Sequence, residues 1–178
     1  MKNMIVFPVL LAALFSGSAY AEPKNGFSVN AGTASHSRDS ASGASLASTS
    51  GLSLGMDYQF ALPANFSISP FLMTSSETIS GVSGTTAGHG ILGGQLRYWA
   101  GDVFVGAHLG SYSEVFVSGN TSTAFTGGGA GLVAGWEQPD GGLYVMGQYD
   151  SAKVSAPGYF DNKFTALRLS VEIGRAHV

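Results

Sequence analysis

The amino-acid sequence predicts an all-β protein: an eight-stranded, antiparallel, up-and-down transmembrane β-barrel. Three observations support this prediction. Eight segments alternate hydrophobic with polar or small residues, only 11% of the residues are charged, and short and long connections alternate along the chain. Soluble domains carry about 25% charged residues. A barrel wall that faces lipid explains the scarcity of charge, because a protein surface in contact with lipid does not need charged side chains.

The N-terminus has the three parts of a cleaved signal peptide. Lys2 supplies the positive charge, residues 5–15 form an apolar run, and residues 19–21 (AYA) form an A-x-A cleavage site. The apolar run is too short to cross a bilayer as a helix. We therefore expect residues 1–21 to be removed on export, with a retained membrane anchor as the alternative.

Several classes of protein are disfavoured by composition. The chain contains no cysteine, so disulfides cannot hold it together. It has no run of basic residues, which leaves nucleic-acid binding without an electrostatic footprint. After residue 21 no stretch approaches the ~20 continuous apolar residues of a transmembrane helix. The composition therefore leaves one class, a protein that is stabilised by its own core or by a membrane.

The eight predicted strands share a period of two, with one apolar and one polar or small face. The first four are NGFSVNAGTA (25–34), GLSLGMDYQFAL (51–62), FSISPFLMT (66–74) and GGQLRYWA (93–100). The last four are VFVGAHLGSY (103–112), GAGLVAGWE (129–137), LYVMGQYD (143–150) and FTALRLSV (164–171). The second is the clearest, because its length suits the ~9–11 residues that a tilted strand needs to cross a bilayer.

The connections between these strands alternate in length. Three are short and contain Pro, Asn, Asp or Gly, which suit tight turns: 63–65, 100–102 and 137–142. Four are longer and rich in Ser, Thr and Gly: 36–50, 75–87, 113–123 and 152–162. In an antiparallel barrel this places short periplasmic turns at one end and long extracellular loops at the other.

Aromatic residues offer a second test of the lipid-facing parity. Five of them lie near the predicted short-turn end, where an interfacial girdle belongs: Phe27, Phe60, Phe66, Tyr98 and Trp136. Two residues fit this face less well. Pro70 has no backbone N–H for the ladder, so we expect a bulge or a loss of pairing there, near the outer rim. Gly147 stands where a bulky apolar side chain would serve lipid better.

The opposite parity predicts a lumen filled by polar side chains. These are Asp57, Gln59, Gln95, Arg97, His108, Asp150 and Arg168. Eight strands leave an interior just wide enough for side chains. We therefore expect a structural network of ion pairs and hydrogen bonds, in which buried charges satisfy one another. The alternative is the lining of a narrow pore.

These features resemble the small eight-stranded outer-membrane barrels, a group that includes the OmpA barrel domain, the OmpX/Ail-like proteins and the opacity-type surface proteins. The resemblance rests on the signal peptide, the alternating strands, GLSLGMDYQF followed by a tight turn, and the glycine-rich GGGAGLVAGWEQPDGGLYV. It implies a location in the bacterial outer membrane, contact with outer-membrane lipid and lipopolysaccharide, and insertion by the barrel-assembly machinery. It also implies a non-enzymatic surface protein whose loops serve adhesion or bind host factors.

Catalytic and metal-binding chemistry is weakly indicated. A lipid A-modifying enzyme is the lesser alternative to a surface protein or a channel, on the ground that His36, Asp39, Glu77 and His89 could all lie near the outer rim. The sequence shows no metal-ligand spacing, so no metal or cofactor is expected. The glycines at 129–134 match a dinucleotide loop only in spacing, because a βαβ context is missing.

The C-terminal residues interrupt the pattern of the eighth strand. Arg175 takes the lipid-facing parity set by Val171 and Ile173. A widely used sequencing adapter, read in frame after a first base G, gives GAG ATC GGA AGA GCA CAC GTC TGA, which encodes residues 172–178 and a stop. We therefore expect residues 22–172 to form the barrel and 173–178 to be adapter read-through. For the same reason Glu172 is left out of the lumenal network.

Overall fold

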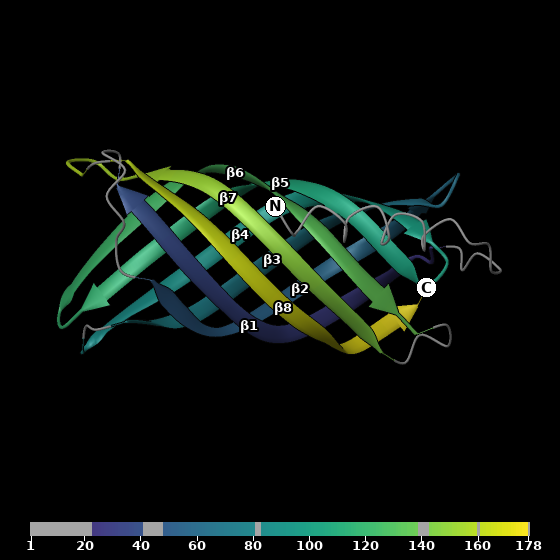
Figure 1. The fold of residues 1–178 in the computed structure, drawn as a ribbon, viewed down its shortest axis with the longest axis horizontal. Helices are drawn as coiled ribbons and strands as arrows, with labels where there is room; N and C mark the ends of the chain where they lie inside the picture. Colours follow the sequence, from purple (N-terminus) through teal and green to yellow (C-terminus); the bar gives the residue numbers. More distant parts are fainter. Residues whose placement is uncertain (1–22, 41–47, 81–82, 139–142, 160, 178) are drawn as a thin grey trace, which may run out of the picture.

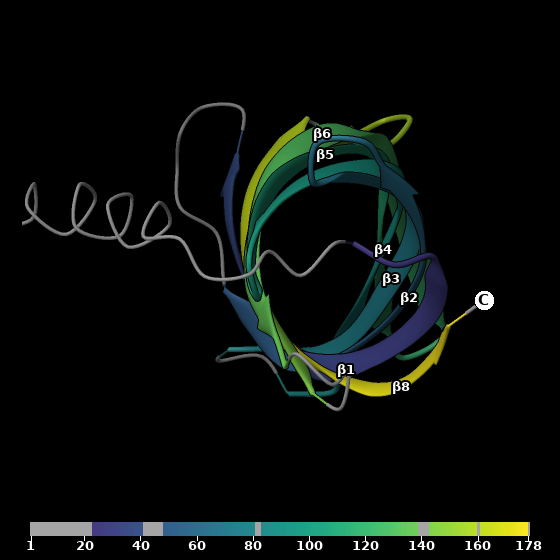
Figure 2. The same ribbon diagram turned by 90° about the vertical axis from the view of Figure 1, so that its right-hand side faces the viewer.

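The protein is described by a computed structural model, which places all residues except 1–22, 41–47, 81–82, 139–142, 160 and 178. The predicted signal peptide therefore lies outside the described residues. Within them, eight β-strands form a closed barrel, and each strand pairs antiparallel with its neighbours in sequence. Strand β1 closes the ring against β8, as Figures 1 and 2 show. The predicted all-β, up-and-down barrel is confirmed.

The strands are longer than the sequence pattern predicts. They are β1 (Gly26–Ser40), β2 (Thr49–Leu62), β3 (Phe66–Ile79), β4 (Thr85–Ala100), β5 (Val103–Ser118), β6 (Thr121–Glu137), β7 (Tyr144–Ser155) and β8 (Asn162–His177). We call the end of the barrel where β1 begins and β8 ends the terminal end, and the opposite end the distal end. Among the described residues, no α-helix is long and apolar enough to span a bilayer.

The four distal connections are shorter than predicted. The expected loop 113–123 is almost entirely strand, and only Gly119 and Asn120 lie between the paired Ser118 and Thr121. Gly119 has a φ of 57°, a left-handed conformation that glycine adopts without strain. The expected loops 36–50, 75–87 and 152–162 likewise lose residues to the strands on both sides.

The outer surface of the wall explains why the predicted loops are longer than the observed ones. Towards the terminal end it carries a lipid belt of exposed apolar residues, whose leucines, 44–73% exposed, are Leu52, Leu54, Leu72, Leu92, Leu96, Leu109, Leu132, Leu167 and Leu169. Towards the distal end it carries a hydroxyl collar of outward-facing residues: Thr33, Ser35, Ser50, Thr74, Ser76, Thr78, Ser111, Thr126 and Ser151. In most strands hydrophobic alternation therefore stops at the collar, although backbone pairing continues. Strand β5 is an exception, because Val117 is exposed on the same face as Leu109.

Strand length agrees with this division of the wall. The strands have from 12 to 17 residues, whereas crossing a bilayer takes ~9–11. The surplus of about five residues in the longer strands, at ~3.3 Å per residue and a tilt of ~40°, extends the wall roughly 10–15 Å beyond the lipid. The hydroxyl collar is the outer surface of that extension.

Pro70 leaves a gap in one ladder. Pairing between β2 and β3 stops opposite Tyr58 and Gln59, and then resumes in the same register. The ladder between β3 and β4 continues through the pair Pro70–Gly94. The predicted loss of pairing is therefore found without a bulge. Its predicted position near the outer rim is wrong, because Pro70 lies in the terminal half of β3.

The glycine-rich stretch of β6 fits against aromatic rings of β5. Gly131 pairs with His108, and Gly135 pairs with Phe104. A Cβ atom at either glycine would collide with the ring opposite it. These two glycines on the inner face of β6 thus make room for rings that fill the lumen. The stretch is a barrel strand flanked by β5 and β7, which excludes the dinucleotide-loop alternative.

The C-terminal segment continues β8 along β1 with one irregularity. Val29 pairs with Gly174 and Asn30 pairs with Glu172, so the ladder passes over Ile173. This register shift falls at the first residue of the segment that we expect to be adapter read-through. The non-native origin of residues 173–178 stays a prediction, which the genomic sequence beyond Val171 would test.

Candidate functional site in the lumen

Polar side chains fill the lumen in three groups, named here from the terminal to the distal end. The terminal group is Ser28, Asp57, Gln59, Gln95 and Arg97. The central group is His108, Tyr112, Gln148, Asp150 and Arg168. The distal group is His36, Arg38, Glu77, His89 and Glu114. All of these side chains are buried, although they belong to a wall only one strand thick.

In the terminal group, Arg97 ties β4 to β2. Its guanidinium donates 3.0 Å hydrogen bonds to Asp57 Oδ2 and Gln59 Oε1. Ser28 of β1 donates to the other oxygen of Asp57 at 2.6 Å. Gln95 lies beside the same guanidinium, with its amide placed so that the oxygen can accept from it. The pairing of charge and the satisfaction of each lone pair offset the cost of burying an ion pair here.

Terminal to this group, three aromatic rings fill the lumen. Phe104 and Tyr144 stack with centroids 5.3 Å apart, and Trp99 packs on Phe104 at 4.8 Å. The guanidinium carbon of Arg97 lies 5.1 Å from the centre of the Phe104 ring. Charge and rings therefore form one continuous packed layer.

In the central group, Asp150 of β7 accepts hydrogen bonds from side chains of two other strands and of β7 itself. His108 Nε2 donates to it at 2.7 Å and the Tyr112 hydroxyl at 2.9 Å, both from β5. Arg168 of β8 pairs with its second oxygen. Gln148, also on β7, donates a further bond at 2.9 Å. A single buried carboxylate thus joins β5, β7 and β8 across the lumen.

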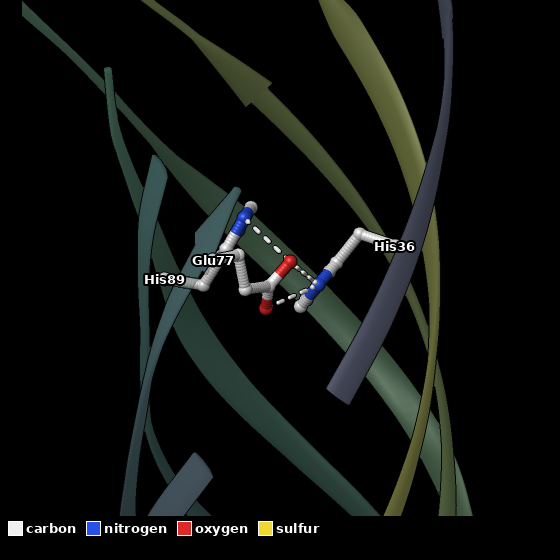
Figure 3. A group of neighbouring side chains, drawn as sticks. All are labelled: His36, Glu77 and His89. Carbon is white, nitrogen blue, oxygen red and sulfur yellow. Dashed lines mark hydrogen bonds and ion pairs between the residues drawn. The ribbon is translucent and has the colours of Figure 1, made fainter. Parts of the chain in front are cut away.

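The distal group is centred on Glu77 of β3, which Figure 3 draws together with His36 and His89. His36 of β1 donates from Nδ1 to Glu77 Oε2 at 2.8 Å. Thr49 and Ser75 donate their hydroxyl protons to the same carboxylate. The His89 ring of β4 stacks on the His36 ring at 3.8 Å. Arg38 extends the group by an ion pair with Glu114 of β5.

Arg168 connects the central and distal groups. Besides its pair with Asp150, its Nη2 donates to His36 Nε2 at 3.0 Å. Because a guanidinium can only donate, Nε2 of His36 must be the accepting nitrogen and Nδ1 must carry the proton. Both ring nitrogens of His36 are therefore engaged, one by Glu77 and one by Arg168.

His36, Glu77 and His89 are residues of metal-ligating type, and their ligand atoms lie within 4.8 Å of one another. Two features favour a hydrogen-bonded plug over a metal centre. The two imidazole rings are stacked at an angle of 9°, so their in-plane lone pairs run parallel instead of converging. The adjacent Arg168 also adds a positive charge. The expectation of no metal or cofactor stays a prediction.

The structure places the predicted site residues as follows. The seven predicted lumenal residues all point inward and are buried: Asp57, Gln59, Gln95, Arg97, His108, Asp150 and Arg168. The five predicted girdle residues all face outward near the terminal end: Phe27, Phe60, Phe66, Tyr98 and Trp136. Phe66 and Tyr98 contact each other at 5.1 Å. Of the four residues suggested for the outer rim, only Asp39 stays apart, exposed on the outer face.

Sequence reasoning missed the distal group as part of the lumenal network. Its members lie in segments predicted to be loops, except for His89 just before the predicted fourth strand. The signal that could have found them is parity. His36 and Arg38 share the inward parity of β1, and Glu114 shares that of His108. Extending the period of two beyond the last hydrophobic residue would have placed them inside.

An apolar outer belt, a polar extension and a filled lumen define a class: a transmembrane β-barrel, eight-stranded within the described residues. No protein-family model and no curated protein matches the sequence. The fold is similar to Ail, the attachment invasion locus protein of Yersinia pestis, at a TM-score of 0.59 and 14% identity, over 86% of this chain and 100% of Ail. Ail in complex with the heparin analogue sucrose octasulfate matches over the same shares, at 15% identity and a TM-score of 0.59. Neisserial surface protein A matches at 0.56 and 16% identity, over 82% of this chain and 95% of that one. The shared property is the fold.

Proposed function

We propose that this protein is a non-enzymatic surface protein of the bacterial outer membrane, anchored by the lipid belt and making contacts through its distal end. The observation that carries the proposal is the extension of the barrel beyond the belt as a hydroxyl-covered wall. Such a wall suits water and gives no advantage inside lipid. In this arrangement the belt contacts membrane lipid and lipopolysaccharide, and the barrel-assembly machinery inserts the chain.

The filled lumen supports an anchor over a channel. Hydrogen bonds cross the interior from β2 to β4, from β5 to β7 and from β1 to β5. A conducting path would have to break these buried bonds, and each group left unpaired would cost ~1–3 kcal/mol, more if charged. The narrow-channel alternative therefore requires a rearranged interior.

The same contacts argue against the lipid A-modifying alternative. A serine hydrolase needs a histidine nitrogen that can take the proton of a serine hydroxyl. Both nitrogens of His36 are already engaged, and Ser75 donates to Glu77 instead of to an imidazole. These contacts support a role of the distal group in packing and in holding the wall.

The names of the structural neighbours support a role of the distal end in contacts with other molecules. Ail is described as an attachment and invasion protein, and the Neisserial protein as a surface protein. We propose that this chain likewise contacts host or envelope partners. Because its distal connections are short, the contact surface consists of the strand ends and the hydroxyl collar more than of long loops.

Membrane orientation gives the direct test of this proposal. The chain has no cysteine, so a single introduced cysteine is the only thiol. Asn120→Cys, in the distal hairpin between β5 and β6, is expected to react with a membrane-impermeant maleimide on intact Gram-negative cells. Gln138→Cys, exposed just after β6 at the terminal end, is expected to react only after the outer membrane is permeabilised.

The paired cysteine variants act as controls for each other, since both sites are exposed and both lie outside strands. Labelling is read on a denaturing gel, with expression normalised by an antibody. Labelling of Gln138→Cys on intact cells while Asn120→Cys stays protected would reverse the orientation and refute the proposal. Equal labelling of both on intact cells would mean that the barrel is not inserted.

A further inference from the structure

The distal opening of the lumen holds a cavity of about 340 Å³. We call it the mouth cup and define it by its seven lining residues: Arg38, Ile79, Phe116, Thr123, Phe125, Tyr159 and Asn162. They come from β1, β3, β5, β6 and β8 and from the connection between β7 and β8. The cup closes the lumen directly above the distal group, since Arg38 belongs to both.

The position of the cup makes its aromatic rings unusual. Phe116 and Phe125 lie beyond the lipid belt, at the level of the strand ends, and Tyr159 lies in a distal connection. Tyr159 is 59% exposed. Aromatic side chains in the belt or girdle face lipid, whereas at this end Tyr159 is exposed and Phe116 and Phe125 line the cavity as partly buried and buried rings. Apolar surface gathered in a water-facing cavity is typical of a ligand-binding site.

The rings of the cup form a connected row. Phe116 and Phe125 contact edge to face with centroids 5.9 Å apart, and Phe125 and Tyr159 do so at 5.6 Å. At the base, the guanidinium carbon of Arg38 lies 4.4 Å from the centre of the Phe116 ring. The cup therefore combines aromatic surface with a buried, ion-paired guanidinium at its floor.

The charge and polarity of the lining residues restrict the kind of ligand that the mouth cup can bind. Arg38, a cation that lines the cup, is ion-paired with the buried Glu114, so this pair gives the floor no net charge. Thr123 and Asn162 add a hydroxyl and an amide to the walls, and both are half-buried. An alkyl chain or an aromatic side chain in the cup would strip water from these groups without replacing its hydrogen bonds, which is costly.

We propose that the mouth cup binds an uncharged sugar ring, the terminal residue of a glycan. A sugar presents C–H groups that pack on aromatic rings and hydroxyl groups that pair with Thr123 and Asn162. The inference rests on the proposed function, because a cup that opens outside the cell meets host and envelope glycans. The inference assigns a class of ligand, uncharged sugars, to the distal surface of the proposed function.

Saturation-transfer NMR with uncharged mono- and disaccharides tests the proposal. The purified protein is held in amine-oxide micelles, because detergents with sugar headgroups would compete for the cup. At least one sugar is expected to receive saturation from the wild-type protein. Removing one aromatic wall by Tyr159→Ala is expected to weaken its binding by roughly fivefold to tenfold, and Thr123→Val, which removes only the hydroxyl, is expected to weaken it as well.

Tyr149→Ala is the matched control, since Tyr149 is an exposed tyrosine in the lipid belt, and it is expected to leave sugar binding unchanged. Three results would overturn the proposal: no transfer to any sugar, transfer unaffected by Tyr159→Ala, or occupation of the cup by the detergent chain or by a peptide alone. The cysteine labelling described above reports orientation independently. Correct labelling without sugar binding would therefore refute this inference and leave the proposed function intact.

Discussion

Replacement of Arg168 by methionine is expected to lower the free energy of unfolding by ~3–5 kcal/mol, the usual cost of removing one partner from a buried ion pair. Arg168 and Asp150 are both buried, and Arg168 also holds His36. Methionine keeps much of the side-chain volume but leaves the Asp150 carboxylate without a cation. Urea unfolding in detergent micelles, followed by the loss of the fast-migrating folded form on an unheated gel, measures the change.

Two further variants serve as controls for this prediction. Lys153→Met breaks an ion pair with Asp161 in which the lysine side chain is 61% exposed, so its expected cost is at most ~1 kcal/mol. Combining Arg168→Met with Asp150→Asn removes both charges, and it should recover part of the loss. An Arg168→Met protein as stable as the wild type would show that the central group does not hold the barrel together.

Substitution of Gly131 by alanine is expected to destabilise the barrel by ~3 kcal/mol, the upper end of the usual cost of overpacking. The added methyl group would collide with the His108 ring and with the backbone carbonyl of Tyr149. A backbone atom on the neighbouring strand cannot move away without disturbing the ladder. His108 would also be pushed from Asp150, so the substitution should weaken the central group as well.

Gly94→Ala is the matched control, because a Cβ at Gly94 would meet nothing within 4 Å. Alanine is better than glycine in a strand by ~0.5–1 kcal/mol, so this variant should be slightly more stable than the wild type. The two substitutions add the same methyl group and are expected to change stability in opposite directions. A loss of stability in both, or in neither, would contradict the packing role given to the inner glycines.

The fold was predictable wherever the wall touches lipid. Residues such as Leu52 and Leu132 must be apolar there, so period two is visible in the sequence. Beyond the belt, outward positions such as Ser76 and Ser111 are polar like their inward neighbours. The pattern then disappears although the strand does not. The predicted loops were too long for this reason, and the Gly119-Asn120 pair was the local sign of a tight hairpin.

The candidate site was predictable in kind but not in detail. Parity identified Asp57, Arg97 and Asp150 as lumenal, because they lie inside strands with a strong pattern. It could not tell which charges meet, since that depends on how far neighbouring strands are staggered around the barrel. The contact between His36 and Arg168 joins residues 132 positions apart. It follows from the register of β1 against β8, which hydrophobicity alone does not reveal.

Ion conductance tests the central claim most directly, because the account rests on a barrel that anchors the protein while its lumen is filled by the three polar groups. Purified wild-type protein is reconstituted into planar lipid bilayers, with insertion verified by protease protection or antibody binding. We predict that inserted protein gives no steady conductance steps. Reproducible single-channel steps from the folded wild-type protein would contradict a filled lumen and establish a channel.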